Sequence, residues 1–426
     1  MPGKAPALRS LEIEGDPRSH AQEGTAGDTS IGLARALDAR SRSAVLAEFG
    51  FLRRADGQLT PPQRFSWAVR GYAALKSGAR EPAIRCCDER SLGRQTVRAT
   101  LLRYFKTAQM GELTSTVPGP SGRPVKIRYA AFLPPDGVPI RGVVHFMNGC
   151  RQSMLRSAEL AYALREHRAA GYALVMHDHR GQGFSDRLLD DPLKGYVGRF
   201  DDYVDDAERV SAMLKRKLAP RMAEGAKWCV AGHSMGAAVA TSCLLDQPEM
   251  AAGFLALSPM YGIKTGIPKG FARAIVRTLA ALERGEPGYV PGAGPDGMRG
   301  GRGKVTGSEA RYALMSWLDG AYPTLRLGGP TRQWLDEALG VCETLQATAH
   351  RLRVPSWMAR SLEDRVVEPA AQSAVARAGG FITRDYAVAP GESEPVGHTL
   401  VSERDRIQHE VTGMIANLMT TGRAFG

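Results

Sequence analysis

The spacing of hydrophobic positions differs between the first hundred residues and the rest of the chain. In the first part, apolar residues recur at helical spacing, as in Phe65, Val69 and Tyr72. This spacing places apolar side chains on one face of a helix. We therefore expect a helical N-terminal region over residues 31–110. Residues 1–30 are polar and aperiodic, which predicts a disordered tail.

From residue 111, short apolar runs alternate with amphipathic stretches. Residues 142–146 and 172–176 are apolar runs of strand length, whereas residues 201–218 form a long amphipathic stretch. This alternation predicts an α/β fold, with a mostly parallel sheet covered by helices on both faces. Further strands are predicted at residues 126–132, 227–231, 253–257, 354–361 and 381–388, and further helices at residues 157–170, 369–378 and 404–419.

Residues 261–345 interrupt the alternation. They contain helical patterns, including residues 308–318 and 330–345, on either side of a Gly- and Pro-rich stretch at residues 287–303. We interpret this segment as a helical cap inserted into the sheet domain. The core then consists of two parts, residues 111–260 and residues 346–426.

A candidate nucleophile follows the predicted strand at residues 227–231. The next five residues, Gly232-His233-Ser234-Met235-Gly236, have the form G-x-S-x-G, and a small, apolar helical pattern follows at residues 237–245. A serine on a sharp turn between a strand and a helix is typical of a catalytic nucleophile. A chance match is the alternative in a chain with 48 glycines. We predict that Ser234 is the nucleophile.

A serine nucleophile needs a base to accept its proton and a carboxylate to orient that base. In the α/β-hydrolase fold these residues follow the serine in the order acid, then histidine, each after a later strand. Asp364 follows the predicted strand at 354–361, and His398 follows the strand at 381–388. We predict Asp364 as the acid and His398 as the base. Glu363 is the alternative acid.

The other eight histidines lack the late position after a strand that singles out His398. His145 and His177 are assigned structural roles in or at the end of strands. His233 lies within the nucleophile turn and is expected to point away from Ser234.

The developing oxyanion needs two hydrogen-bond donors. One is expected to be the backbone N–H of Met235, the residue after the nucleophile. The second is expected in the loop after the strand at residues 142–146, where Gly149 permits close backbone approach. We predict the backbone N–H of Cys150 as this second donor.

Composition and charge limit the possible partners. The chain has 426 residues and a net charge of +12. An excess of basic residues can indicate nucleic acid, an anionic membrane or only solubility. The sequence contains no nucleic-acid-binding motif with interleaved aromatic residues, so nucleic acid is not an expected partner.

Two further features bear on the cellular location. No apolar run approaches the roughly 20 residues of a membrane span, and the N-terminal residues lack the apolar segment of a signal peptide. The six cysteines form no C-x-x-C pair, which argues against a zinc site or a disulfide framework. We expect a cytoplasmic protein, with peripheral membrane contact as an option.

Two patterns that suggest cofactors are weak. Residues 292–297 match G-x-G-x-x-G, but they follow no predicted strand and contain a proline. The acidic residues at 201–206 fit the first turns of a helix, where the helix dipole stabilises them. The predicted chemistry requires neither a cofactor nor a metal, and we expect none.

Several motifs in order resemble a known family. The stretch Asp178-His179-Arg180-Gly181-Gln182-Gly183-Phe184-Ser185-Asp186, with the G-x-S-x-G turn, resembles the monoacylglycerol lipase and lysophospholipase group of α/β-hydrolases. The cap motifs at residues 258–263, 308–312 and 327–335 are similar to those of bacterial inner-membrane-associated lysophospholipases. The resemblance covers about residues 111–420. It implies Ser234, Asp364 and His398 as the triad, and an acyl-lipid substrate.

Three functions remain open at this point. The favoured one is hydrolysis of ester bonds in single-acyl lipids, either lysophospholipids or monoacylglycerols. The second is hydrolysis of small esters, lactones or peptides by the same triad. The third is a binding or effector protein in which the N-terminal region acts and the hydrolase fold is a scaffold.

The cap also carries a basic amphipathic helix. Apolar residues such as Phe271 and Ile275 recur at helical spacing among Lys269, Arg273 and Arg277. This pattern fits a cap helix packed over the sheet, and it also fits a surface that contacts anionic lipid. The sequence gives no indication of the oligomeric state.

Overall fold

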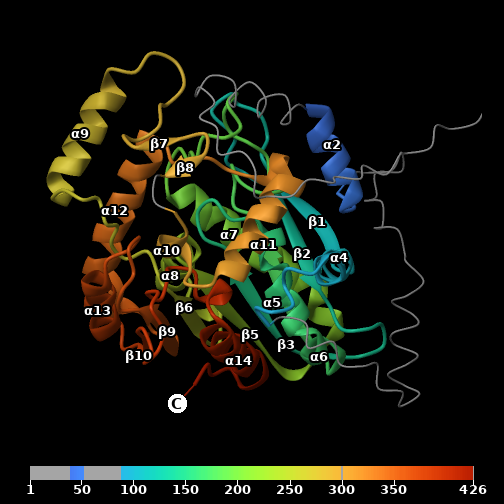
Figure 1. The fold of residues 1–426 in the computed structure, drawn as a ribbon. Coiled ribbons are helices and arrows are strands. Elements are labelled where there is room, and N and C mark those ends of the chain that lie inside the picture. Colours follow the sequence, from blue (N-terminus) through green and yellow to red (C-terminus); the bar gives the residue numbers. More distant parts are fainter. Residues whose placement is uncertain (1–38, 52–87, 299–300, 426) are drawn as a thin grey trace, which may run out of the picture.

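One eight-stranded sheet forms the centre of the computed structural model, which describes residues 39–51, 88–298 and 301–425 (Figure 1). The strand order is β1-β2-β4-β3-β5-β6-β9-β10. From β4 to β10 neighbouring strands are parallel, whereas β2 is antiparallel to both β1 and β4. The strands are β1 (Gln109–Thr114), β2 (Lys126–Phe132), β3 (Ile140–Met147), β4 (Tyr172–His177), β5 (Met222–His233), β6 (Phe254–Leu257), β9 (Ser356–Ser361) and β10 (Ile382–Tyr386).

Helices cover both faces of this sheet, as the alternating side chains of β5 illustrate. Cys229 and Ala231 belong to the core under α5 (Ala158–Ala163) and α14 (Asp405–Thr421). Val230 points to the opposite face and packs with α7 (Asp201–Leu218) and α8 (Met235–Asp246). A strand that is buried on both faces is apolar at successive positions, which explains the continuous run in the sequence.

Two further core helices lie within predicted helices: α6 (Arg165–Ala169) within residues 157–170, and α13 (Pro369–Ala378) at residues 369–378. The sequence did not predict the short 3₁₀ helices, which are Met154–Ser157, Ala219–Arg221, Pro248–Met250, Pro323–Leu325, Ala349–Arg351 and Leu400–Ser402. The helix predicted at residues 157–170 is divided into a 3₁₀ turn, α5 and α6. The edge strand β1 was not predicted, because its short sequence QMGELT contains no apolar run.

Two described helices of the N-terminal region pack against the core. These are α2 (Ala39–Glu48) and α4 (Gln95–Phe105). Phe49, just after α2, lies 6.0 Å from the ring of Phe105 and 5.1 Å from the ring of Phe184 in the core. The predicted disordered tail and the predicted helix around Phe65 lie outside the described residues.

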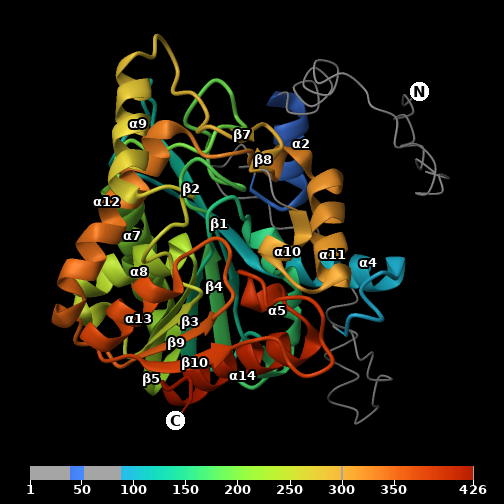
Figure 2. The same ribbon diagram turned by 60° about the vertical axis from the view of Figure 1, so that its left-hand side comes forward.

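The inserted cap consists of two separated parts (Figures 1 and 2). One part contains α9 (Lys269–Ala281) and α12 (Arg332–Thr348), and α9 lies at the outer edge of the molecule. The other contains α10 (Gly301–Val305) and α11 (Glu309–Ala321), which lie near α5. A small hairpin, β7 (Ala293–Gly294) and β8 (Gly297–Met298), lies between α9 and α10 in the sequence.

A buried ion pair anchors α11 to the core. The guanidinium of Arg311 donates hydrogen bonds of 2.9–3.2 Å to the carboxylate of Glu159 on α5, and both side chains are almost fully buried. None of the helices in the described ranges is both long and apolar enough to cross a bilayer.

Candidate active site

Ser234 occupies the turn between β5 and α8, in a backbone conformation that is strained for a residue with a side chain. Its φ is 54° and its ψ is −118°. A Cβ at Gly232 would lie 2.7 Å from Cα of Ala237, and one at Gly236 would lie 2.2 Å from the carbonyl oxygen of Met147. The two glycines of the motif are therefore required by close backbone approach.

The backbone of Ser234 is also tied to the end of β6. Its N–H donates to the carbonyl of Leu257 at 3.0 Å, and its own carbonyl accepts from the N–H of Met260 at 3.1 Å. Strain of this kind persists only where the surroundings fix the conformation. These two bonds and the glycine contacts fix it here.

His398 lies between Ser234 and Asp364. Its Nε2 is 2.8 Å from Oγ of Ser234, and its Nδ1 is 2.7 Å from Oδ2 of Asp364. In the tautomer with the proton on Nδ1, the ring donates to the carboxylate and presents a free lone pair on Nε2 to the serine hydroxyl. The structure thus brings together the three residues predicted as nucleophile, base and acid.

The carboxylate of Asp364 is buried and held by its own loop. Its Oδ1 accepts hydrogen bonds from the N–H groups of Val366 and Val367, at 2.8 and 3.0 Å. Burial acts to raise the pKa of Asp364, but His398 and the two N–H groups outweigh it and lower the pKa below the usual value. The neighbouring Glu363 points elsewhere, because its carboxylate accepts from the N–H of Val396 at 3.0 Å.

The two predicted oxyanion donors lie on either side of the nucleophile. Met235 is the first residue of α8, so no helix carbonyl lies four residues before it to accept its N–H. Gly149 brings the second loop close, since a Cβ at this glycine would lie 3.2 Å from Cβ of Ser234. Among the described residues, the N–H of Cys150 has no hydrogen-bond partner. Burial raises the pKa of the Cys150 thiol to about 12, so the thiol stays protonated.

His233 contacts His398, which the sequence did not indicate. Its ring centroid is 4.9 Å from that of His398, and its Nδ1 lies 3.3 Å from the carbonyl oxygen of Leu257. Burial, and then the charge of His398, lower the pKa of His233 to about 3. His233 therefore remains neutral at physiological pH and lies beside His398.

The loop that carries His398 is held by the cap. The N–H groups of His398 and Thr399 donate to the carbonyls of Lys304 and Val305 in α10, at 3.2 and 2.8 Å. A Cβ at Gly397 would lie 2.4 Å from Cα of Thr306, so only glycine permits this packing. The glycine before the histidine was the only sequence signal for this contact.

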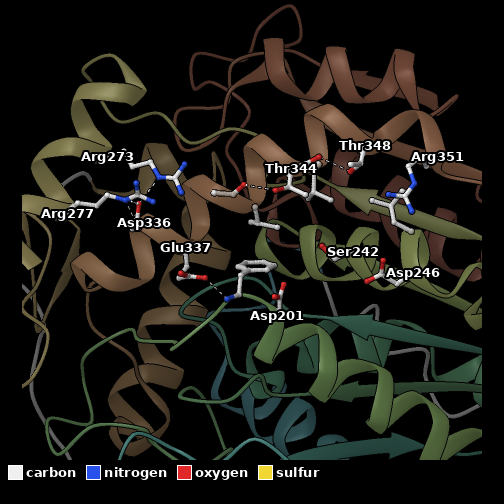
Figure 3. A pocket seen from close by; sticks show the side chains of 15 residues that line it. Asp201, Ser242, Asp246, Arg273, Arg277, Asp336, Glu337, Thr344, Thr348 and Arg351 are labelled. Carbon is white, nitrogen blue, oxygen red and sulfur yellow. Dashed lines mark hydrogen bonds and ion pairs between the residues drawn. The ribbon is translucent and has the colours of Figure 1, made fainter.

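A cavity of about 320 Å³ lies away from these residues, between α8, α9 and α12 (Figure 3). Several of its charged groups already have partners: Arg273 and Arg277 both donate to Asp336, and Glu337 accepts from the N–H of Phe200. Within the described ranges, no group of His, Cys, Asp or Glu side chains is arranged to hold a metal ion.

A mostly parallel sheet with a serine on the turn after its central strand defines an α/β-hydrolase with a serine nucleophile. The model of the family described as Hydrolase_4, serine aminopeptidase S33, matches residues 138–405. The chain belongs to this family, which confirms the predicted fold and the predicted relationship to lipases and lysophospholipases.

Named relatives agree with this assignment. The chain is 33% identical to lysophospholipase L2 of Escherichia coli K12 over 250 residues, covering 56% of this chain and 71% of the relative. It is 28% identical to the probable lysophospholipase L2 of Haemophilus influenzae, covering 58% and 75% of the two chains. A solved monoglyceride lipase from Saccharomyces cerevisiae has the same fold, with a TM-score of 0.54, 15% identity, and 70% and 92% of the two chains covered.

Proposed function

We propose that this protein hydrolyses the ester bond of single-acyl lipids, with Ser234 as nucleophile, His398 as base and Asp364 as the residue that orients the base. The observation that carries this proposal is the continuous hydrogen-bond chain from Oγ of Ser234 to Oδ2 of Asp364, with distances of 2.8 and 2.7 Å.

The chemistry follows from this geometry. His398 Nε2 removes the proton of Ser234 as Oγ attacks the ester carbonyl. The N–H groups of Met235 and Cys150 bind the resulting oxyanion. The protonated His398 then gives its proton to the leaving alcohol, and the acyl-enzyme remains. Water attacks this intermediate with His398 as base again, which releases the fatty acid and restores the serine.

Support for a lipid substrate comes from the relatives and from the cap. The proteins at 33% and 28% identity are named lysophospholipase L2 and probable lysophospholipase L2. The cap also exposes a row of large apolar side chains on or near α9. Their exposed fractions are 47% for Ile267, 70% for Phe271, 44% for Ile275 and 74% for Leu282.

The test of the proposed function is Ser234→Ala, measured on esters of increasing acyl length and by labelling with a fluorophosphonate probe. We expect loss of both turnover and labelling, because the nucleophile is gone. Ser242→Ala is the matched control, since it removes a hydroxyl two turns further along α8 and should leave activity intact. Labelling that survives in Ser234→Ala would refute the assignment.

The same panel of substrates distinguishes a lipid hydrolase from a peptidase. This distinction is needed because the family is described as serine aminopeptidases. A lipid hydrolase should prefer long-chain lysophospholipids or monoacylglycerols over short esters, lactones and aminoacyl amides. A preference for aminoacyl amides would instead identify a peptidase that uses the same triad.

We also propose that the protein is cytoplasmic and that α9 contacts anionic phospholipid surfaces peripherally. The exposed apolar row would enter the lipid boundary, and the net charge of +12 favours an anionic surface. The arginines Arg273 and Arg277 on the same helix are paired with Asp336, so we assign the main role to the apolar side chains.

The double substitution Phe271→Ser with Leu282→Ser tests this contact. Burying two such side chains contributes about 1.5–3 kcal/mol each, so binding to phosphatidylglycerol vesicles should fall at least about tenfold. Hydrolysis of a soluble short-chain ester should not change. Ile382→Ser, at another exposed apolar position (51% exposed) on β10, is the control that should bind vesicles normally. Unaltered vesicle binding in the double variant would rule out this contact.

A further inference from the structure

The oxyanion loop, residues 148–152, is held in place by hydrogen bonds to side chains of the 178–186 loop. Nε2 of His179 lies 3.1 Å from the carbonyl oxygen of Asn148, and Nε2 of Gln182 donates to the carbonyl oxygen of Gly149 at 3.1 Å. The amide oxygen of Gln182 also accepts from the N–H of Arg151, at 3.1 Å. Gln182 is only 1% exposed, so its amide is committed to these two bonds.

The two bonds of Gln182 lie on either side of Cys150. The carbonyl of Gly149 and the N–H of Cys150 belong to the same peptide unit, which is planar and trans, so they point in opposite directions. This carbonyl accepts from the side chain of Gln182 and, at 3.3 Å, from the backbone N–H of Gln152, so Gln182 sets the direction of the Cys150 N–H together with the backbone of the loop. The hydrogen bond from Gln182 also polarises the peptide unit and makes its N–H a stronger donor.

The second bond holds a strained residue. Arg151 has a φ of 64°, which is uncommon for a residue other than glycine. Its N–H is the one that Gln182 accepts, so the bond stabilises the turn immediately after Cys150. The other end of the loop is closed by Gln152, whose side-chain oxygen accepts from the N–H of Gly149 at 3.1 Å. The N–H of Cys150 is thereby left for a ligand.

We propose that Gln182 is a positioning residue of the oxyanion hole, which fixes the N–H of Cys150 in the direction of the developing oxyanion. The proposal rests on the proposed function, in which Cys150 supplies the second donor. Gln182 acts through this peptide and does not touch the substrate. Gln182 should stabilise the transition state more than the bound substrate, because the negative charge on the ester carbonyl oxygen of the substrate develops only in the transition state.

The experiment compares Gln182→Met with Gln408→Met. Both substitutions replace a buried glutamine amide with a side chain of similar size, and Gln408 lies on α14 with a single side-chain bond to Thr412. For a soluble short-chain ester, Gln182→Met should lower kcat by about 10–100-fold. This loss is smaller than the loss on removing an oxyanion donor, because the N–H of Cys150 is still present but less well oriented. KM should change less than twofold, and Gln408→Met should leave both constants unchanged.

A second measurement separates positioning from a general structural role. A trifluoromethyl ketone forms a tetrahedral adduct with an oxyanion, so its inhibition constant should rise in Gln182→Met by about the factor by which kcat falls. An unchanged inhibition constant, a kcat within twofold of the parent enzyme, or a loss confined to KM would each overturn the proposal.

A second variant covers the case in which Gln182→Met does not fold. Gln182→Glu keeps an acceptor for the N–H of Arg151 but loses the donor to the carbonyl of Gly149, and we expect the same fall in kcat at neutral pH. Full activity of this variant would overturn the proposal. Ser234→Ala keeps the two proposals apart: if it abolishes turnover and labelling while the Gln182 variants are fully active, only the role of Gln182 is refuted.

Discussion

The two sides of Ser234 are held in place by different additions to the hydrolase core. On the base side, the loop of His398 is fixed by α10 of the inserted cap. On the oxyanion side, the 148–152 loop rests on the 178–186 loop, which in turn is fixed by the N-terminal helix α2. The core sheet supplies the turn that carries Ser234, the proposed nucleophile, but neither partner loop is positioned by the sheet alone.

One buried carboxylate joins the cap to the base loop. Oε2 of Glu403 accepts hydrogen bonds from the N–H of Gly307 in the cap and the N–H of Gly397 beside the base, at 2.8 and 2.9 Å. Its Oε1 accepts from the backbone and side chain of Arg404. Both oxygens therefore face donors, and the carboxylate is fully buried.

One arginine joins the N-terminal region to the oxyanion side. The guanidinium of Arg42 on α2 donates to the carbonyl oxygens of Phe184 and Ser185, at 3.0 and 2.6 Å, and to that of Thr324 in the cap at 3.0 Å. The ring of Phe184 is enclosed by the N-terminal side chains Phe49 and Phe51, each 5.1 Å away. Burial lowers the pKa of Arg42 to about 10, so it stays charged at neutral pH.

The base side is held by a charged acceptor, whereas the oxyanion side is held by donors to backbone carbonyls. A carboxylate replaced by an amide keeps only one acceptor oxygen, so its NH₂ group faces N–H groups that have lost their acceptor. A guanidinium that is removed leaves carbonyls, which tolerate a missing partner better. We therefore expect changes on the base side to have the larger effects.

The largest effect is expected for Asp364→Asn. The amide can present its NH₂ group to Nδ1 of His398, which favours the wrong tautomer and should lower kcat by about 10⁴-fold. Steady-state kinetics on a soluble ester measure this loss. Glu363→Gln is the matched control and should stay within a few-fold of the parent enzyme. The reverse order of the two effects would make Glu363 the acid.

Asp364→Asn should also change how the stability of the protein depends on pH. The pKa of Asp364 is lower in the folded protein than in the unfolded chain, so the unfolded chain binds more protons between the two values. This carboxylate therefore contributes stability above its unfolded pKa of about 3.9, and the contribution is lost as the pH falls through the lower folded value. Urea unfolding at several acidic pH values should show a smaller pH dependence in Asp364→Asn.

An intermediate effect is expected for Glu403→Gln. Either orientation of the new amide places an NH₂ group against donors, which costs about 1–3 kcal/mol of stability. Because these donors join the cap to the base loop, kcat should fall by roughly 10-fold, the factor equivalent to about 1.4 kcal/mol.

Urea unfolding and steady-state kinetics give both quantities for Glu403→Gln. Glu410→Gln is the control, since it also removes an ion-paired carboxylate near the C-terminus, at a partly exposed position on α14. Equal behaviour of the two variants would show that the base loop does not depend on Glu403.

The smallest effect is expected for Arg42→Met. Loss of the bonds to the 178–186 loop should loosen the oxyanion side and lower kcat a few-fold, with about 1 kcal/mol lost in stability. Arg103→Met, at an exposed position on α4, is the control and should change neither quantity. If kcat is unaltered well below the unfolding temperature, the N-terminal region has no part in holding the oxyanion side.

Local patterns in the sequence were enough to predict most elements and their order. The strand, the G-x-S-x-G turn and the helix around Ser234 follow from short-range rules, because apolar runs and close-approach glycines act over a few residues. The chain order of Ser234, Asp364 and His398 then selected three residues that the structure places in hydrogen-bond contact. The predicted fold and family are confirmed. The disordered tail and the helix around Phe65 remain predictions.

The contacts that hold the site together became apparent only in the folded structure. Arg42 reaches carbonyls 141–143 residues away in the sequence, and Glu403 reaches the N–H of Gly307 across 96 residues. No periodic pattern marks such contacts, because each depends on where distant loops meet after folding. The division of the cap into two parts has the same origin, since the partners of α10 and α11 lie on core elements far from them in the chain.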